Sequence, residues 1–364
     1  MRAEAPIVAV QAQAYTIPTD VPESDGTLEW SSTTMVLARV RGAGLEGLGY
    51  TYADTATAAL IRDKLAPLLI GRDAWAIGAR WIDMTRAVRN LGRTGICSMA
   101  ISAVDCALWD LKGKLIGASL VDLLGASRDG VEAYGSGGFT SYSLARLERQ
   151  LSGWAREGLH AVKMKVGRDP IQDTVRVAKA RQAIGNEVAL FVDANGAYTD
   201  AQALTQAERF GEHCVAWFEE PVSSDHLESL RLLRERRPGG MAIAAGEYGY
   251  DLFYFHRMLD ADAVDVLQAD GTRCGGITGY LAAGGLCQAR SMPFSAHCAP
   301  SLHAHPSCAL PAFCYLEFFH DHDRIEHLFF DGALSPVDGA LRPDPTRPGF
   351  GLEFKRQDAA RYAL

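Results

Sequence analysis

From about residue 131 to residue 319, short apolar runs alternate with amphipathic stretches. The amphipathic stretches predict helices, most clearly at 144–154, 171–184, 200–210 and 229–236. Strands that alternate with helices indicate parallel βαβ units, and eight such units predict a (β/α)₈ barrel. A doubly wound open sheet is the alternative, but no GxGxxG turn follows the first run. The eight apolar runs are VEAYGS, HAVKMKV, VALFVDAN, AWFEE, MAIAAGE, AVDVLQAD, SMPFSAH and FCYLEFF.

The chain before residue 131 follows a different pattern. Thr33–Val40 is rich in β-branched and apolar residues and precedes a glycine-rich turn at 41–49, which predicts a strand and a hairpin. Apolar residues recur at helical spacing over 55–69 and 99–115. The segment 19–30 is polar and contains proline and glycine, so we expect a mobile loop there. The N-terminal part is therefore predicted to be α+β, a short sheet followed by helices.

Composition and charge narrow the class of protein. The chain has 364 residues, 48% hydrophobic and 22% charged, which is typical of a globular protein. Its net charge of −8 comes without a basic tract, so nucleic acid and anionic membranes are not expected as partners. No apolar stretch reaches the length of a membrane span, and residues 1–18 lack the pattern of a signal peptide. The eight cysteines form no CxxC pair, so a cytoplasmic protein is expected.

Titratable residues stand at the ends of seven of the eight predicted strands. In a barrel, the carboxyl ends of the strands form one face, where residues distant in the sequence converge. A single charged strand end is a weak indication of a site, but seven in succession are hard to assign to a solvated rim. These residues are Lys165, Asp193, Glu219, Glu247, Asp270, His297 and Glu317.

Three consecutive strand ends supply carboxylates, those of Asp193, Glu219 and Glu247. Carboxylates that converge in a confined site must be protonated, held apart or bound to a cation. An all-oxygen ligand set favours Mg²⁺ over Mn²⁺ or Ca²⁺, since zinc more often binds His or Cys. We therefore expect one Mg²⁺ with open positions for substrate oxygens and water. Glu220 is expected on the other side of the strand, behind the ligands, although either glutamate remains a candidate ligand.

Two basic groups are predicted on opposite walls of the barrel. Lys163 and Lys165 are two residues apart, so both should project inward while Met164 points to the helices. Neighbouring ammonium groups lower each other's pKa, which makes Lys165 the candidate general base and leaves Lys163 to assist it and to bind substrate. On the other wall, Asp270 is expected to orient the imidazole of His297 and raise its basicity. The alternatives are two surface lysines and a histidine with a structural role only.

Other polar residues are candidate substrate contacts. Asn195 lies two residues after Asp193, where it could touch the substrate or orient a metal ligand. Trp30 could contact the substrate or anchor its loop by hydrophobic packing. Ser136 belongs to a Gly- and Ser-rich first strand end, which is expected to admit a polyhydroxylated chain.

These strand-end residues, in this order, resemble the enolase superfamily and, within it, the mandelate racemase subgroup. The racemase's relatives with a lysine base on the sixth strand are less similar, because this chain has Asp270 there. The segments 271–273 and 298–300 depart from the racemase itself, so its aromatic substrate is not implied. The resemblance covers nearly the whole chain and rests on AISAVDCALWDLKGK (100–114), KMKVG (163–167), VDANGAY (192–198), WFEEP (217–221), AGE (245–247), RCGGITG (273–279), SAH (295–297), YLE (315–317) and PGFGLE (348–353).

The resemblance implies an organisation and a set of roles. Residues 1–128 would form an α+β capping domain whose loops at 20–30 and 50–52 close over the site. Residues 129–328 would form the barrel, and 329–364 would pack back on the capping domain. Relatives of this kind often form homo-oligomers, from dimers to octamers. Asp193, Glu219 and Glu247 match the Mg²⁺ ligands, Lys165 and His297 the two bases that flank the substrate, Asp270 the partner of the histidine, and Glu317 an acid that hydrogen-bonds the substrate carboxylate.

The expected reaction is removal of the proton α to a carboxylate. Bound Mg²⁺ would stabilise the charge that develops, and Glu317 would assist if crowding by other anions keeps it protonated. Loss of a β-hydroxyl would then yield a 2-keto-3-deoxy acid, so the leading hypothesis is a dehydratase of a sugar acid, an aldonate or aldarate. Return of a proton to the opposite face would instead make the protein a racemase or epimerase of a 2-hydroxy acid.

Two other classes remain as alternatives. An amidohydrolase-type zinc enzyme would need HxH on the first strand, where this chain has Tyr134-Gly135-Ser136; only His297, His303 and His305 form a histidine-rich patch. A barrel that binds a metal and an acid without catalysis is the non-enzymatic alternative.

Overall fold

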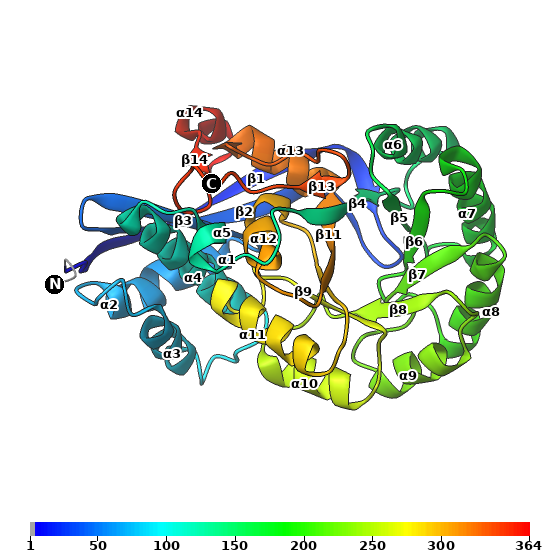
Figure 1. The fold of residues 1–364 in the computed structure, drawn as a ribbon, viewed down its shortest axis with the longest axis horizontal. Helices are drawn as coiled ribbons and strands as arrows, with labels where there is room; N and C mark the ends of the chain where they lie inside the picture. The colour runs from blue at the N-terminus through cyan, green and yellow to red at the C-terminus, as the bar shows by residue number, and fades with distance from the viewer. Residues whose placement is uncertain (1–3) are drawn as a thin grey trace.

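The computed structural model describes residues 4–364. Its N-terminal part is an antiparallel sheet in the order β1–β2–β3, with helices packed on one face (Figure 1). The strands are β1 (Ile7–Ser24), β2 (Glu29–Gly42) and β3 (Leu45–Tyr52). The helices are α1 (Ala56–Leu60), a π-helical turn (Ile61–Leu65), α2 (Ala66–Leu69), α3 (Ile77–Ala87), α4 (Ile96–Ile116) and α5 (Leu120–Leu123).

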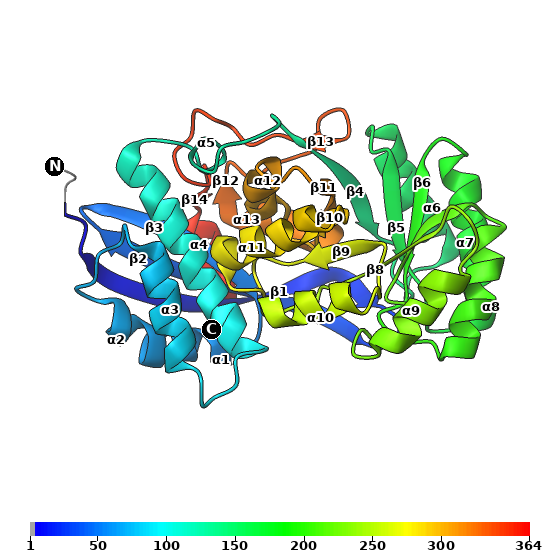
Figure 2. The same cartoon turned by 60° about the horizontal axis from the view of Figure 1, so that its bottom comes forward.

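Helix α4 joins this sheet to the rest of the molecule, and Figure 2 shows it between the two parts. It lies so close to β3 that a Cβ on Gly47 would be 2.1 Å from the carbonyl oxygen of Ala107. Its far side contacts the helix that follows the sixth barrel strand, where Asp105 accepts hydrogen bonds from Thr278. Because α4 is covered on both sides, its sequence is apolar almost throughout, beyond the single stripe of a surface helix.

Eight parallel strands form a closed barrel, because the last strand, β11, pairs with the first, β4. This confirms the fold predicted from the alternating pattern. The strands are β4 (Val131–Gly137), β5 (Ala161–Lys165), β6 (Ala189–Asp193), β7 (Val215–Glu219), β8 (Ala242–Ala245), β9 (Val266–Ala269), β10 (Phe294–Ala296) and β11 (Phe313–Phe319). The helices are α6 (Leu144–Arg156), α7 (Pro170–Ile184), α8 (Asp200–Gly211), α9 (Leu227–Arg236), α10 (Leu252–Asp260), α11 (Gly276–Ala289), α12 (Pro300–Cys308) and α13 (His320–Phe329).

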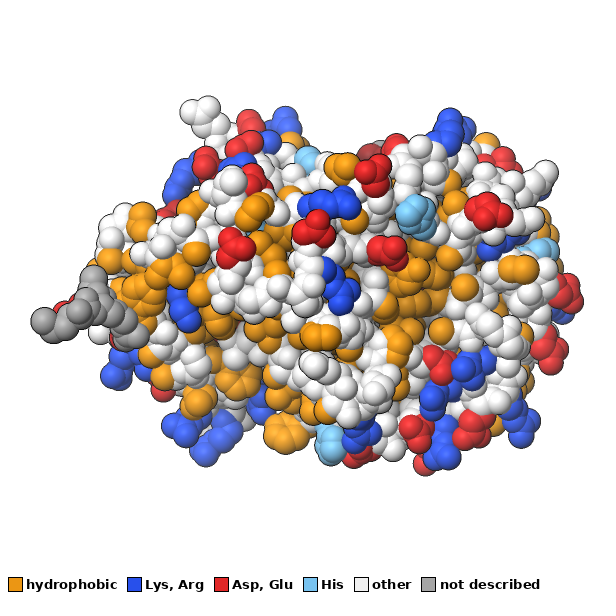
Figure 3. Space-filling model, in the orientation of Figure 1, with side chains coloured by type: hydrophobic (Ala, Val, Ile, Leu, Met, Phe, Trp, Pro, Cys, Tyr) orange, Lys and Arg blue, Asp and Glu red, His pale blue; other side chains and the backbone are white. Residues whose placement is uncertain are grey.

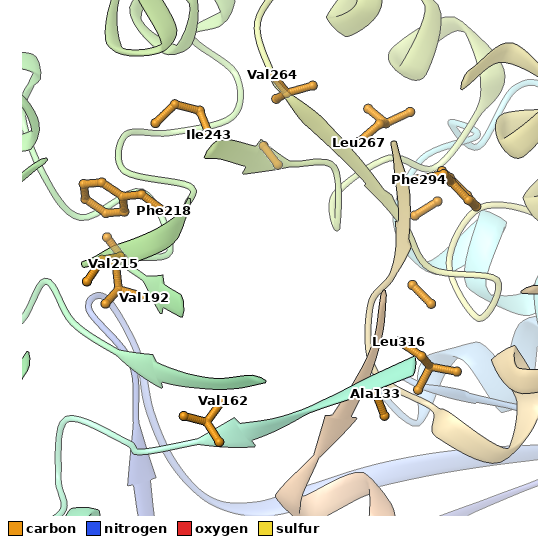
Figure 4. Packing of buried hydrophobic residues seen from close by; sticks show 14 of the residues in the cluster. Ala133, Val162, Val192, Val215, Phe218, Ile243, Val264, Leu267, Phe294 and Leu316 are labelled. Carbon is orange, nitrogen blue, oxygen red and sulfur yellow. The ribbon is translucent and has the colours of Figure 1, made fainter. Parts of the chain in front are cut away.

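Alternation along the strands separates the barrel wall into two layers. One layer packs against the surrounding helices and includes residues from all eight strands, as Figure 4 shows for Val162, Phe218 and Leu316 among others. The other layer fills the barrel interior with large aromatic side chains, including those of Tyr134 and Trp217. Polar residues take over the inward positions toward the carboxyl ends of the strands, so the chemistry begins where the apolar plug ends.

The segment after the barrel returns to the N-terminal sheet. It contains β12 (Phe330–Asp331), β13 (Ala340–Leu341), β14 (Glu353–Phe354), α14 (Arg356–Ala359) and a 3₁₀ turn (Ala360–Tyr362). Phe329 of α13 and Phe350 share a buried cluster with Tyr15 and Ile17 of β1. An antiparallel bridge also joins Tyr15 to Ala363. The exact domain boundaries at 128 and 328 stay a prediction.

The expected mobile loop at 19–30 is instead a β-hairpin arm. Strand β1 continues to Ser24, and β2 begins at Glu29, so only the tip between them is a turn. The arm, blue in Figures 1 and 2, extends from the capping sheet to the barrel. There Ser24 hydrogen-bonds Thr140, and the ring of Trp30 packs edge-on against Phe139. The prediction of a loop was wrong because Pro18 and Pro22 lie in the strand at the edge of the sheet, where proline is tolerated.

Two surface properties complete the fold. On the face shown in Figure 3, acidic and basic side chains are interspersed. Within residues 4–364, no helix combines the length and the apolar character that crossing a membrane requires.

Candidate active site

A cavity of about 450 Å³ lies between the barrel and the capping sheet, at the carboxyl ends of the strands. Its barrel wall carries five of the predicted strand-end or neighbouring residues: Lys165, Asn195, Glu247, His297 and Glu317. Its other wall comes from the hairpin arm and from the end of β3. The cavity is therefore closed only by the two parts of the chain together.

The three predicted metal ligands converge beside this cavity. Asp193 ends β6, Glu219 ends β7, and Glu247 follows β8 after a glycine. All three are buried, and each offers a carboxylate oxygen within 4.8 Å of the oxygens of the other two. Such a set of hard oxygen donors suits a Mg²⁺-sized cation, which is commonly held by a few carboxylates while water and substrate complete its coordination.

The electrostatics of the acidic group also fit a cation. Burial raises the pKa of Glu219 to about 8, and the nearby charge of Asp193 adds to this rise. Burial, Glu247 and Asp193 raise the pKa of Glu220 well above its usual value, and its buried Oε1 has no hydrogen-bond partner among residues 4–364. These carboxylates resist full ionisation together, and a divalent ion would relieve that repulsion.

The strand alternation that was used to place Glu220 ends one residue before it. Strand β7 ends at Glu219, and Glu220 adopts a left-handed conformation with φ of 37°, so the inward–outward alternation stops there. Its side chain lines a second cavity that also borders Asn195 and Tyr248. Glu219, whose inward position follows from the strand, is the one that joins Asp193 and Glu247.

Both lysines of β5 project inward, and Met164 between them packs with the helix-facing layer, as predicted. Lys163 lies beneath the cavity, where its Nζ is 2.7 Å from both oxygens of Glu219 and 2.9 Å from Oε1 of Glu317. Lys165 lies at the cavity wall and donates to Oδ2 of Asp193. Lys163 thus contacts carboxylates and does not reach the cavity surface.

While Asp193 and Glu247 carry free charges, the pKa of Lys165 is raised, in contrast to the expected lowering. Burial lowers this pKa, and Lys163 lowers it further, but the carboxylates of Asp193 and Glu247 outweigh both and raise it. Two lysines alone would have favoured a neutral amine. Sequence spacing shows the second lysine on the same strand, but not the acid that reaches over from β6.

His297 and Asp270 form the predicted pair. His297 Nδ1 is 2.9 Å from Oδ2 of Asp270, and both side chains are buried at the ends of β10 and β9. Burial lowers the pKa of His297, but Cys298, Glu247 and the hydrogen bond to Asp270 raise it well above its usual value. The other ring nitrogen, Nε2, lies 3.1 Å from Oε2 of Glu247 and borders the cavity.

Glu317 lies in the cavity wall, but its neighbours are cations. Burial raises the pKa of Glu317, yet Lys163, His297 and Lys165 outweigh burial and lower it. The expectation of a protonated Glu317, which assumed crowding by anions, was therefore wrong for these surroundings. Ser136 Oγ donates to Oε1 of Glu317 at 2.6 Å. Ser136 thus contacts this carboxylate and does not line the cavity.

Of the remaining candidate residues, Asn195 and Trp30 line the cavity. The backbone N–H of Asn195 donates to Oδ1 of Asp193 at 2.9 Å. The buried Oδ1 of Asn195 itself has no hydrogen-bond partner among the described residues. Trp30 both lines the cavity and anchors the arm, since its Nε1 donates to Glu23 and its ring packs on Phe139. Gly135 packs against Trp154, so the first strand end does not open to the cavity as expected.

The histidine patch does not form a zinc site. His303 Nδ1 donates to the carbonyl oxygen of Cys298, and its Nε2 accepts from the backbone N–H of Gly271. His305 Nε2 bonds to the carbonyl oxygen of Phe350. Both nitrogens of His303 and Nε2 of His305 thus bond to the backbone, and no possible metal-ligand group within residues 4–364 contains more than one histidine.

Sequence reasoning missed several residues of the cavity. Arg273 contacts the carbonyl oxygen of Glu247 and lies beside Asp270, and it was noticed only as part of a motif. His322 follows Glu317 by five residues, in the HDHD segment that begins α13. Thr33 and Thr34 were assigned only to a strand, whose alternation gives no sign that its outer end faces a cavity.

The arm presses closely on the barrel at Gly26. A Cβ there would lie 2.5 Å from the carbonyl oxygen of Ala194 and 2.8 Å from that of Val166. These residues directly follow Asp193 and Lys165, so the tip of the arm rests on the backbone that carries both. A side chain at this position would have to lift the arm or displace the strand ends.

Gly26→Ala is therefore expected to lower kcat/KM about 100-fold, because small misplacements at a reacting centre cost that much. The thermal midpoint should change little, since the contact is local. Gly78→Ala in α3 is the matched control, because a Cβ there meets no atom within 4 Å. Equal kcat/KM in the two variants would show that the arm does not position the site.

Comparisons with known proteins identify the family of the chain. The family model for the mandelate racemase/muconate lactonizing enzyme N-terminal domain matches residues 8–125, and the enolase C-terminal domain-like model matches residues 146–359. The chain is 29% identical to D-galactarolactone cycloisomerase of Agrobacterium fabrum, over 98% of this chain and 99% of that protein. It is 32% identical to 3,6-anhydro-alpha-L-galactonate cycloisomerase of Streptomyces coelicolor, over 96% and 98%.

Solved structures give the same picture. A mandelate racemase/muconate lactonizing enzyme-like protein from Rubrobacter xylanophilus is 54% identical, with a TM-score of 0.96 over 99% of this chain and 100% of the other. A Streptomyces coelicolor racemase with bound magnesium is 30% identical, with a TM-score of 0.93 over 98% and 100%. An L-talarate dehydratase from Polaromonas, complexed with Mg and L-glucarate, is 30% identical, with a TM-score of 0.90 over 99% and 98%. The chain therefore belongs to the mandelate racemase/muconate lactonizing enzyme family of the enolase superfamily.

Proposed function

We propose that this protein is a Mg²⁺-dependent enzyme that removes the α-proton of a sugar acid and eliminates the oxygen at the β-carbon, as a dehydratase. The observation that carries the proposal is the pairing of two basic side chains, Lys165 and His297, on one cavity beside a trio of carboxylates. An α-proton next to a carboxylate is so weakly acidic that its removal needs both a base and stabilisation of the resulting charge.

Asp193, Glu219 and Glu247 would hold the Mg²⁺. When bound, the ion supplies stabilisation of negative charge on the substrate carboxylate. Magnesium is present in the solved racemase and dehydratase relatives, which supports this assignment.

The other residues receive roles from their contacts. Lys165 would remove the α-proton once a cation takes up the charge of Asp193, which otherwise raises the pKa of this lysine, and His297, held by Asp270, would donate a proton to the departing oxygen. Lys163 and Ser136 hold Glu317, which faces the substrate. Asn195 offers an unpaired oxygen to a substrate hydroxyl, and Trp30 closes the cavity wall.

The polar capping wall supports a sugar acid as substrate. Ser32, Thr33 and Thr34 line the cavity opposite the lysine and histidine. The curated relatives include arabinonate, L-talarate/galactarate and D-galactonate dehydratases, together with the two cycloisomerases. Racemisation or epimerisation of a 2-hydroxy acid is the second candidate, because a base on each side of one carbon could also return a proton to the opposite face.

A panel of sugar acids tests the proposal. We expect at least one aldonate or aldarate, incubated with Mg²⁺, to yield a semicarbazide-reactive 2-keto product. Exchange of the α-proton in D₂O without keto product, followed by NMR, would favour the epimerase instead. No keto product and no exchange with any acid would refute both. The cytoplasmic location and the homo-oligomer stay predictions.

A further inference from the structure

His322 presents an unused hydrogen-bond donor to the active-site cavity. It lies near the start of α13, lines the cavity and is only 7% exposed. Its ring stacks flat on Tyr52 of the capping sheet, with centroids 3.4 Å apart and an angle of 9° between the planes. Phe319 packs edge-on against the same ring at 5.0 Å. The imidazole is thus fixed between the two parts of the chain, and no charge is needed to hold it.

The backbone sets which nitrogen of His322 carries the proton. Nδ1 accepts a hydrogen bond from the N–H of Ala299 at 3.3 Å, so Nδ1 has no proton of its own. In the neutral ring the proton is then on Nε2. Burial and the nearby charge of His297 lower the pKa of His322 well below its usual value, which agrees with a neutral ring. Among the described residues, no group forms a hydrogen bond with Nε2, although the residue faces the cavity.

Charge is distributed unevenly around the cavity. Its cationic or protonatable basic groups other than His322 are Lys165, Arg273 and His297, all from the barrel strands or their loops. The capping half contributes hydroxyl groups and the carboxylates of Asp25 and Asp54, and none of its lining residues is basic. One substrate carboxylate can therefore meet cations at the barrel end, whereas a second at the capping end would meet acidic side chains and a neutral imidazole.

We infer that the capping half of the cavity binds the uncharged hydroxyl end of a sugar acid with a single carboxylate, and that His322 Nε2–H donates a hydrogen bond to an oxygen of that end. This inference rests on the proposed function and narrows its substrate class to aldonates and their cyclic relatives, at the expense of the dicarboxylic aldarates. An uncharged donor suits a hydroxyl or ring oxygen, because it need not be desolvated as an ion.

The first experiment compares aldonates with the aldarates of matching length and stereochemistry, using the wild-type protein and Mg²⁺. We expect kcat/KM for the best aldonate to exceed that for its matching aldarate at least tenfold. This is about the cost of placing the second carboxylate of the aldarate beside acidic side chains. Equal or faster turnover of the aldarate would overturn the inference and leave the proposed function intact.

The second experiment replaces the donor and keeps the ring. His322→Phe preserves stacking on Tyr52, and we expect it to lower kcat/KM for the aldonate about tenfold, mainly through KM, the usual cost of a lost neutral hydrogen bond. His322→Gln, which retains an N–H, should recover part of the loss. His327→Phe, an exposed position on the same helix, is the control.

A short acid separates binding from folding. D₂O exchange into lactate, which lacks the distal hydroxyls, should proceed at the same rate in wild type and His322→Phe. A loss on lactate equal to the loss on the aldonate, or an unchanged KM for the aldonate, would overturn the role of His322. Failure of the wild type on every acid would instead refute the proposed function.

Discussion

Replacing Lys165 with methionine is expected to lower kcat/KM by about 1000-fold, because the side chain that removes the α-proton is lost. Its aliphatic stem remains, so the packing of β5 should be kept. Deuterium exchange at the α-carbon in D₂O should fall by the same factor, since exchange needs proton removal but not elimination. Lys179→Met on α7 is the control, because the ammonium of that lysine hydrogen-bonds Gln182 on the helix surface, away from the cavity.

The variant His297→Asn distinguishes the role of His297 from that of Lys165. If His297 acts on the departing oxygen, this variant should stop keto product but still exchange the α-proton through Lys165. His256→Asn, at an exposed histidine paired with Asp260, is the matched control. Exchange that survives in Lys165→Met and disappears in His297→Asn would reverse the two roles.

Removal of the metal should lower activity by a factor similar to that expected for Lys165→Met. Treatment with a chelator is expected to lower activity to less than about one thousandth of that of the untreated enzyme. Mg²⁺ but not Zn²⁺ should restore the activity, because the ligands are all carboxylates. Calorimetry should find one Mg²⁺ per chain. At 100 times its Kd the ion should stabilise the fold by about 2.7 kcal/mol.

Because burial raises the pKa of Glu219 to about 8, protons compete with the ion, and Mg²⁺ affinity should weaken as the pH falls below that value.

Glu247→Gln should prevent this binding, whereas Asp20→Asn should not. Asp20 belongs to another group of ligand-type side chains, formed by Asp20 and Glu23 of the hairpin arm with His320 of α13. The pair of variants therefore distinguishes the trio from another acidic cluster of the same chain. Mg²⁺ binding that persists in Glu247→Gln and disappears in Asp20→Asn would contradict the assignment.

The sequence predicts the barrel well because a strand buried on both faces is a continuous apolar run and a helix has regular apolar spacing. Each of these patterns can be read within one short segment of the chain. The same alternation places Lys163 and Lys165 inward and Met164 outward. It does not predict Glu220, whose left-handed backbone depends on the turn after β7. It also misses the outer part of β1, where prolines mimic the composition of a loop.

Properties that depend on contacts across strands were predicted poorly. The pKa shifts of Lys165 and Glu317 have the opposite sign to the expectation, because each group lies nearest to a partner of opposite charge from another strand. His322 could not be found from its own segment, since its role depends on Tyr52, far away in the chain. Ligand types at strand ends are readable in a sequence, but the partners that tune them are not.

The capping sheet buries part of its surface only against residues that lie far along the chain. Tyr15 and Ile17 of the first strand share their cluster with Phe350 and Leu352, and Tyr15 pairs with Ala363. Contacts between residues so far apart in the sequence form slowly, because a long loop must close before they can be made. Strand β1 therefore keeps one apolar flank exposed until residues 350–363 have docked on it, even when the barrel has already formed. A variant that weakens this docking would leave the flank open to chaperones and proteases.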